Sequence, residues 1–136
     1  MAQALDDLLD SLEDADDATR EEAAKALAEL ANPATLDALI GACGDEFWSV
    51  RTRAGWGVAR IGGVKAIEAL IVLFNDPIME VRNEAVAAVI SLGVGQLDRL
   101  LAAMKDERWR VREHAAKACL HSLFLFPPDS EFHHHM

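Results

Sequence analysis

Two stretches of the 136-residue chain decide the fold: DEFWSVRTRAGWGVARIGG at residues 45–63 and DPIMEVRNEAVAAVISLG at residues 76–93. Each stretch begins with an aspartate, continues to Val-Arg, and runs through an alanine-containing segment to a glycine. Copies of one structural unit keep the same residue types at the same offsets. The shared pattern therefore indicates an internal repeat.

The same pattern extends along the chain as four units. Their arginines are spaced by 31, 31 and 30 residues, with Thr19-Arg20 in place of the first Val-Arg. Apolar residues stand 15, 12, 11 and 8 positions before each arginine, and this spacing is one stripe of an α-helix. Each unit therefore predicts a first helix, a turn with the aspartate, and a second helix with the arginine. The aspartates are Asp14, Asp45, Asp76 and Asp106, and the arginines are Arg20, Arg51, Arg82 and Arg112.

Helix stop signals separate the units at Asn32-Pro33, Gly62-Gly63 and Gly93-Val94-Gly95. We expect first helices at about residues 3–13, 33–43, 64–74 and 95–104, and second helices at about residues 17–31, 48–62, 79–93 and 108–125. Helices this short are marginal alone, so neighbouring units must bury their apolar stripes. The predicted fold is an all-α solenoid of four helix-pair repeats in one domain over residues 1–126, with repeats at about 1–32, 33–63, 64–94 and 95–126.

The aspartate, Val-Arg and alanine-rich columns resemble the HEAT-repeat superfamily, in particular the short bacterial and archaeal subtype called the phycobilisome-lyase HEAT-like repeat. The resemblance covers residues 1 to about 126. It implies an α-solenoid of four HEAT-like repeats in which the aspartate and arginine columns form an inter-repeat ladder. It also implies that the second helices line a concave binding face. The copies differ from one another as in a natural, bacterial or environmental sequence.

Composition restricts the classes of partner. Thirteen basic and 23 acidic residues give a formal net charge of −10, which disfavours binding to nucleic acid or to anionic membranes. No apolar run reaches the ~18 residues of a membrane span, and the acidic start of the chain is unlike a signal peptide. Cys43 and Cys119 fit no disulfide or metal-binding spacing, so we expect a reduced, cytoplasmic protein.

Catalytic residues are missing from the repeat pattern. Deoxyhypusine hydroxylase, an enzyme built from similar repeats, binds two irons through His-Glu pairs placed just after the repeat arginine. The matching pairs in this chain are Glu21-Glu22, Thr52-Arg53, Asn83-Glu84 and Glu113-His114. His114 and His121 stand about 10 Å apart along one helix, too far to bind one metal, so we expect both to be solvated. The sequence predicts no enzyme activity, no cofactor and no metal site.

Positions on the second helices that packing does not require form the candidate binding face. The predicted partner-binding residues are Trp48, Arg53, Trp56, Arg60, Asn83, Trp109, Arg110, His114 and Lys117. Trp56 leads this set because its column otherwise holds lysine or alanine, and tryptophan and arginine are frequent interface hot spots. Gly55 and Gly57 flank it at a cost to helix stability. They indicate a close approach to the backbone by either a neighbouring helix or a partner.

Two function hypotheses follow from this pattern. The first is a non-catalytic scaffold that binds a protein of unknown identity on the concave face of the solenoid. The second, implied by the lyase resemblance, is an accessory or enzymatic role such as bilin-lyase-like chromophore handling.

The C-terminal end predicts a further contact. The last helix carries a run of apolar residues with no fifth repeat to cover them, although a terminal repeat needs a polar outer face. We expect either that residues 127–130 fold back or that two copies form a homodimer through the C-terminal repeat. Within the tail of residues 127–136, EFHHHM has the character of a cloning scar and a tag remnant.

Overall fold

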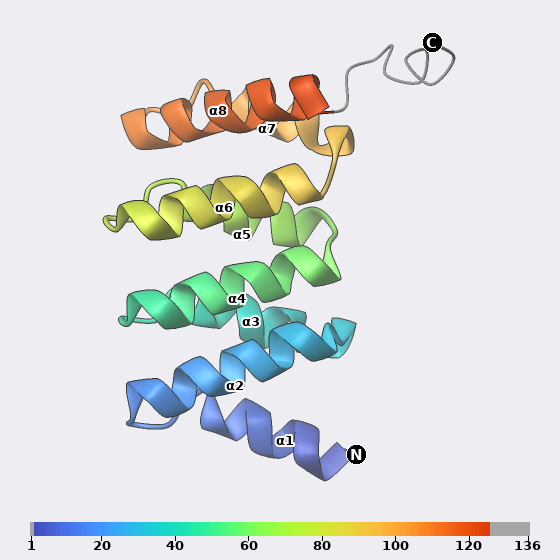
Figure 1. Cartoon of the computed structure of the whole chain (residues 1–136), viewed down its shortest axis with the longest axis vertical. Coiled ribbons are helices and arrows are strands. Elements are labelled where there is room, and N and C mark those ends of the chain that lie inside the picture. Colours follow the sequence, from blue (N-terminus) through green and yellow to red (C-terminus); the bar gives the residue numbers. More distant parts are fainter. Residues whose placement is uncertain (1, 126–136) are drawn as a thin grey trace.

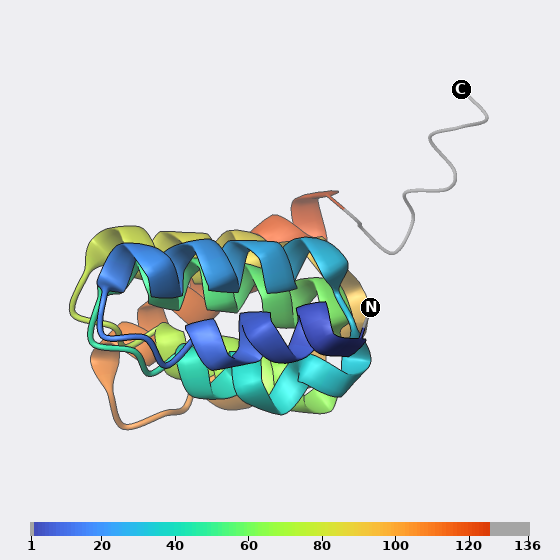
Figure 2. The ribbon, with the colours of Figure 1, turned by 90° about the horizontal axis from the view of Figure 1, so that it is seen from below.

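The computed structural model describes residues 2–125, in which two layers of helices form a stack. In Figure 1 the second helices of the four pairs lie in the front layer and the first helices lie behind them; Figure 2 shows both layers along the stack. The predicted all-α solenoid of four helix pairs is confirmed. The elements are α1 (Ala2–Ser11), α2 (Asp17–Leu30), the 3-10 helix η1 (Pro33–Thr35), α3 (Leu36–Ala42), α4 (Trp48–Ile61), α5 (Val64–Leu73), α6 (Met79–Ser91), the 3-10 helix η2 (Val94–Gln96), α7 (Leu97–Ala103) and α8 (Trp109–Leu125).

The helix ends follow the stop signals, with one difference in the first helices. The helices expected at 33–43 and 95–104 each begin with a separate 3-10 turn, η1 or η2. At η1 the Asn32 side chain accepts a hydrogen bond from the Ala34 N–H, and Pro33 fixes the backbone of the first position. Gly62 (φ 82°) ends α4 in a conformation that favours glycine, as the sequence predicts.

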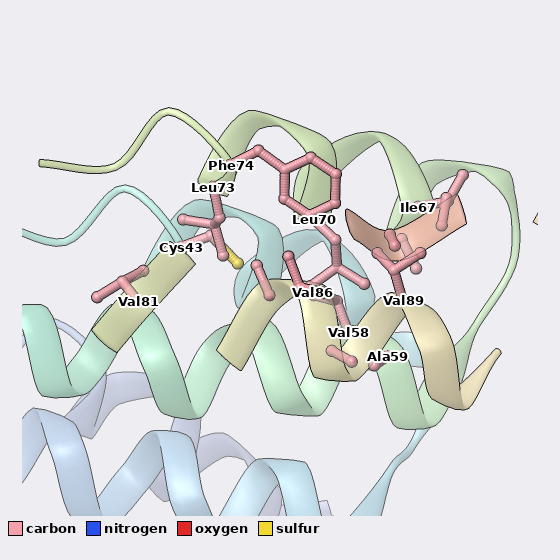
Figure 3. Packing of buried hydrophobic residues seen from close by; sticks show 14 of the residues in the cluster. Cys43, Val58, Ala59, Ile67, Leu70, Leu73, Phe74, Val81, Val86 and Val89 are labelled. Atoms are coloured by element: carbon pink, nitrogen blue, oxygen red, sulfur yellow. The ribbon is translucent and has the colours of Figure 1, made fainter. Parts of the chain in front are cut away.

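The core lies between the two layers and runs the length of the stack. Figure 3 shows its middle, where Cys43, at the end of α3, meets side chains of α4, α5 and α6 in one cluster. The apolar columns predicted from the sequence supply it: Leu39, Leu70 and Leu100 occupy the same position in three repeats, and each is fully buried. A buried leucine stabilises the fold by about 1.5–3 kcal/mol relative to an exposed one. The repeat period thus builds a continuous core.

Arginine and aspartate side chains join consecutive repeats at one edge of the stack. Arg20 Nε donates to Asp45 Oδ2 at 2.9 Å, and Arg51 Nε donates to Asp76 Oδ2 at 2.7 Å. The Nη1 atoms of the same arginines donate to backbone carbonyls of their own turns, including Asp14 O and Asp45 O, both at 2.8 Å. Each guanidinium therefore connects its own inter-helix turn to the turn of the next repeat.

The aspartates also shape the turns in which they lie. Oδ1 of Asp45 accepts from the Phe47 N–H and Oδ1 of Asp76 accepts from the Ile78 N–H, both at 2.9 Å. Phe47 and Ile78 are the N-cap residues of α4 and α6, so each aspartate acts two residues before the cap. The turn bond and the bond from the arginine of the preceding repeat therefore orient the same carboxylate.

The third ladder position, between repeats 3 and 4, is not formed. Arg82 and Asp106 make no ion pair in the described part of the chain, and the buried Nε of Arg82 has no hydrogen-bond partner there. Asp106 instead accepts two bonds from the Arg108 side chain, at 2.9 and 3.1 Å, and one from its backbone N–H; these bonds, the side-chain ones first, lower the pKa of Asp106 to about 2. Arg108 stands where the other repeats have Asp16, Phe47 and Ile78. The Arg108 side chain thus binds the Asp106 carboxylate that the repeat pattern assigns to Arg82.

We predict that Asp76→Ala lowers the free energy of unfolding by about 3 kcal/mol, because it leaves the guanidinium of Arg51 largely buried without its carboxylate. Urea denaturation followed by circular dichroism measures the change. Asp14→Ala is the matched control: its side chain is exposed and pairs with no arginine among the described residues, so a loss under about 1 kcal/mol is expected. Equal losses in the two variants would contradict the ladder.

Replacing Arg108 by the isoleucine of the preceding repeat should restore the third pair. In Arg108→Ile, Asp106 is released toward Arg82, and we expect Tm to rise by a few degrees because a buried donor gains its acceptor. Hydrogen exchange of the Arg82 Nε–H, followed by NMR, supplies the second measurement. Exchange should slow if Asp106 accepts from this group, and an unchanged rate would contradict the release of Asp106 toward Arg82.

Candidate functional site

Trp56 lies in the middle of α4 on the face formed by α2, α4, α6 and α8, which we call the second-helix face. Its side chain is 47% exposed, which is unusual for an indole in a helix interior. The Arg60 guanidinium carbon lies 5.7 Å from the centre of the indole ring, within the range of a cation–π interaction. The two residues are one helical turn apart, so α4 presents them together.

Arg60 is held in place by the neighbouring repeat. Its Nε donates to the Ala28 carbonyl oxygen at 2.9 Å, and Ala28 lies in the last turn of α2. The last carbonyls of a helix have no partner within the helix, so this bond caps α2 while it orients the guanidinium over Trp56. Sequence reasoning missed this structural role of Arg60, because the bond joins residues 32 positions apart.

The two glycines beside Trp56 are explained by packing within the chain. A Cβ on Gly57 would lie 3.2 Å from both Cα and Cβ of Ala28 and 3.0 Å from a methyl group of Leu39. A Cβ on Gly55 would lie 3.0 Å from a methyl group of Leu73. Of the two alternatives, the close approach comes from neighbouring helices and not from a partner. Its result is that α4 stands close to α2.

The second helices pack closely, whereas open grooves separate the first helices. The crevice beside Trp56, between α4 and α6, has a volume of only 10 Å³. Grooves of 550 Å³ between α1 and α3, and of 590 Å³ at the starts of α5 and α7, open on the other side. Such spacing bends a stack toward its closely packed layer, which supports the prediction that the second helices form the concave side. It also makes the surface at Trp56 too flat for a small molecule, since ligand pockets measure about 300–1,000 Å³.

The other predicted residues of this face form two groups. On α4, Trp48 is 42% exposed at the first position, and Arg53 lies 3.5 Å from a carboxylate oxygen of Glu21, which offsets its charge. On α8, the Arg110 guanidinium carbon lies 5.2 Å from the indole centre of Trp109, which is 57% exposed.

Helix α6, with exposed Asn83, lies between the two groups. The exposed Lys117 on α8 lies 3.6 Å from Glu113. The predicted patch is therefore two tryptophan–arginine pairs on separate helices, and not one continuous cluster.

The prediction of a solvated, partner-facing His114 is wrong. The side chain is 3% exposed, and its ring centre lies 6.3 Å from that of Phe74 in repeat 3. Nδ1 donates to the Arg110 carbonyl oxygen at 2.8 Å, because a carbonyl can only accept. The position faces the preceding repeat, where Phe74 offers an apolar surface, so the imidazole packs inward. His121 is exposed, as predicted.

The reactive groups of the chain are not arranged for chemistry in its described part. Burial raises the pKa of the Cys43 thiol to about 12 and raises that of Cys119 above its ordinary value. Neither thiol is a useful nucleophile near neutral pH, because the thiolate is the reactive form. Within residues 2–125, no group of three or more His, Cys, Asp or Glu side chains could hold a metal ion, and none of the helices has the length and apolar character to cross a membrane.

Comparisons with known proteins agree with this fold. A family model described as HEAT repeats matches residues 5–91. Two engineered proteins from the Northeast Structural Genomics Consortium share 24% and 22% of residues, with TM-scores of 0.52 and 0.55; the match covers 84% and 88% of this chain but only 61% and 62% of theirs.

The complex of CpcE and CpcF of phycocyanin lyase from Nostoc sp. PCC7120 is also similar. It is 20% identical with a TM-score of 0.59, over 92% of this chain and 66% of that chain. The chain thus spans less than two thirds of the length of each of these structures. No curated protein sequence matches it.

The two glycines of α4 should respond differently to alanine. Gly57→Ala should lower the free energy of unfolding by about 1–3 kcal/mol, because the new methyl group meets the backbone of α2, which cannot move without the helix. Gly55→Ala is the matched variant: its methyl group meets only flexible ends of Leu73 and Leu70, so the gain in helix propensity of about 1 kcal/mol should offset the contact. Urea denaturation of both variants measures the difference. A more stable Gly57→Ala would show that α2 and α4 do not limit each other's spacing.

Proposed function

Because the chain belongs to the HEAT-repeat family, we propose that it is a non-catalytic scaffold that binds a protein on its second-helix face. The observation that carries this proposal is the exposed Trp56 with Arg60 fixed above it. The exposed indole places more apolar surface in water than the lysine or alanine at the matching position of the other repeats, and this exposure is unfavourable. A partner that covers the indole removes this cost.

The pair is prepared for binding before a partner arrives. The Arg60 side chain is already held by α2 and lies over the Trp56 ring, so less side-chain freedom is lost on association. Tryptophan and arginine are also the residue types that contribute most in alanine scans of interfaces. Burial of the indole in a partner would strengthen the cation–π contact, because desolvation increases it.

The chemistry of the face suggests which segment it would accept. Trp56 offers an apolar surface, and the guanidinium of Arg60 beside it offers a site for a carboxylate. Glu84 lines the crevice beside the indole and would disfavour a second acidic group there. We therefore propose a protein segment with an apolar side chain next to one acidic residue.

Trp56→Ala should weaken partner binding about tenfold or more, because a central hot spot contributes at least about 2 kcal/mol. The partner is first isolated with the intact chain from a peptide library or a lysate, and its affinity for each variant is then measured by calorimetry. Trp56→Ala should fold normally, since alanine favours a helix. Lys25→Ala is the control, because Lys25 is the exposed residue of the same column in repeat 1.

The results separate three cases. Loss of affinity in Trp56→Ala but not in Lys25→Ala supports the proposed site. Equal loss in Trp109→Ala would mean that the partner spans both tryptophan–arginine pairs. Unchanged affinity in all three variants would exclude the second-helix face as the site.

A second candidate function is an accessory role in chromophore handling, which the likeness to the phycocyanin lyase complex favours. The crevice of 10 Å³ at Trp56 argues against a chromophore bound there. Absorption spectra of the purified chain with an added linear tetrapyrrole test this role. A spectrum equal to that of the free pigment excludes it.

A further inference from the structure

The ladder pairs have a direction along the stack. In the two pairs that form, Nε and Nη2 of the arginine both bind the aspartate of the following repeat, at 2.9 and 3.2 Å for Arg20–Asp45 and at 2.7 and 3.0 Å for Arg51–Asp76. In these two pairs the arginine extends toward the C-terminal end of the stack and the aspartate faces the N-terminal end. A surface that extends this ladder supplies the matching group.

The N-terminal end presents such an aspartate without an arginine. Asp14 Oδ1 accepts from the Asp16 N–H at 2.9 Å, the same distance and the same two-residue offset as in the turns of Asp45 and Asp76. The carboxylate is thus held in ladder geometry. It is exposed and pairs with no basic side chain among residues 2–125.

A groove of 360 Å³ lies on the same end, between α1 and α2. Apolar and acidic side chains line it, among them Leu8, Ala23 and Glu22. Glu22 occupies in repeat 1 the position that Arg53 occupies in repeat 2. Arg53 faces the preceding repeat, where it lies close to Glu21. The groove is therefore on the surface that, in repeat 2, receives a neighbouring helix pair.

The C-terminal end presents the complementary arginine. Arg112 Nη1 donates to the carbonyl oxygens of Asp106 and Glu107 at 2.8 and 2.9 Å, as the arginines of the formed pairs do in their own turns. The guanidinium is exposed and has no carboxylate within 4.0 Å among the described residues. It therefore has the orientation of a ladder arginine without an acceptor.

Exposed apolar side chains also lie on α7, just after it, and on α8, at positions where a following repeat would pack. Leu101 and Leu120 are 51% and 58% exposed, and Met104 is exposed as well. The matching residues of repeat 3 are covered by repeat 4: Phe74, at the position of Met104, is fully buried, and Ile90, at that of Leu120, is half-buried. The C-terminal surface has the character of an internal repeat interface.

The two ends also differ in charge. Residues 1–32 hold two basic and ten acidic side chains, whereas residues 95–126 hold six basic and four acidic ones. Opposite charge favours contact between unlike ends and disfavours contact between two N-terminal ends. Together with the ladder geometry, this selects a second copy of the chain as the occupant of the groove.

We propose that the C-terminal end of one copy docks on the N-terminal end of another, with Arg112 paired to Asp14 of the second copy. The contact joins two different surfaces, so each added copy leaves one end available, and the copies form an open series. This differs from the homodimer predicted through the C-terminal repeat, which would join two identical surfaces and stop at two copies.

Docking should be weaker than an internal interface. Ala28 and Gly57 permit the close contact of α2 with α4. In the docked copies, Leu120 of the C-terminal end takes the place of Ala28, and Ala26 of the N-terminal end takes the place of Gly57. Both side chains are larger than those in the internal contact. They keep the docked helices further apart. We therefore expect association that grows with concentration and weakens with salt, because the charged pair is exposed to solvent before docking.

Sedimentation of the full chain from micromolar to near-millimolar concentration tests the proposal. The mass should rise beyond that of two copies at low salt. Asp14→Arg alone and Arg112→Asp alone should each remain monomeric, since each places like charges at the contact. The double variant, and an equimolar mixture of the two single variants, should associate again because both restore opposite charges. Circular dichroism confirms that each variant folds.

A monomer at every concentration would overturn the proposal, and so would a mass that stops at two copies and is unchanged by Asp14→Arg. Failure of the double variant and of the mixture to associate would overturn the Arg112–Asp14 pairing. Trp56→Ala should associate as the unmodified chain does, because Trp56 lies on the second-helix face and not at an end. This variant separates failure of end-to-end docking from failure of the proposed partner site.

Discussion

The guanidinium of Arg51 is bound at once by the turn of its own repeat and by the aspartate of the next one. This double attachment ties two consecutive helix pairs together at one edge of the stack. A helix pair buries its apolar stripe only against its neighbours, so its stability depends on that placement. The core runs along the stack, and the ladder adds a polar link at the first two of the three interfaces between repeats.

The close approach of α2 and α4 is a second constraint on the structure. Gly57 permits it, Arg60 caps α2 across it, and Trp56 is left on the surface above. The same residues that bring the helices together thus hold the exposed indole and its arginine in one orientation. The residues that set the spacing of α2 and α4 lie beside the proposed binding residue Trp56, so a change in the helix spacing would also change the surface around the indole.

At the two ends of the described stack, the ladder residues keep their turn geometry without a partner from a neighbouring repeat. Asp14 and Arg112 keep the turn geometry of the internal pairs although each lacks its counterpart within residues 2–125. Their turns are shaped by bonds within one repeat, so the geometry is present before any contact is made. The opposite case is found between repeats 3 and 4. There Asp106 is bound by Arg108 of its own turn, and the pair with Arg82 of the preceding repeat is not formed.

The period, the helix ends and the main buried columns followed from the sequence, because they depend on spacing along the chain and on glycine and proline signals. The surface depended on contacts between residues far apart in sequence. His114 turned inward because Phe74, 40 positions earlier, offered it an apolar surface, and Arg60 found a carbonyl of α2. The sequence by itself determined that the chain is a solenoid and which columns build it. Only the tertiary structure decided which side chains remain exposed, because that depends on what each neighbouring repeat places opposite them.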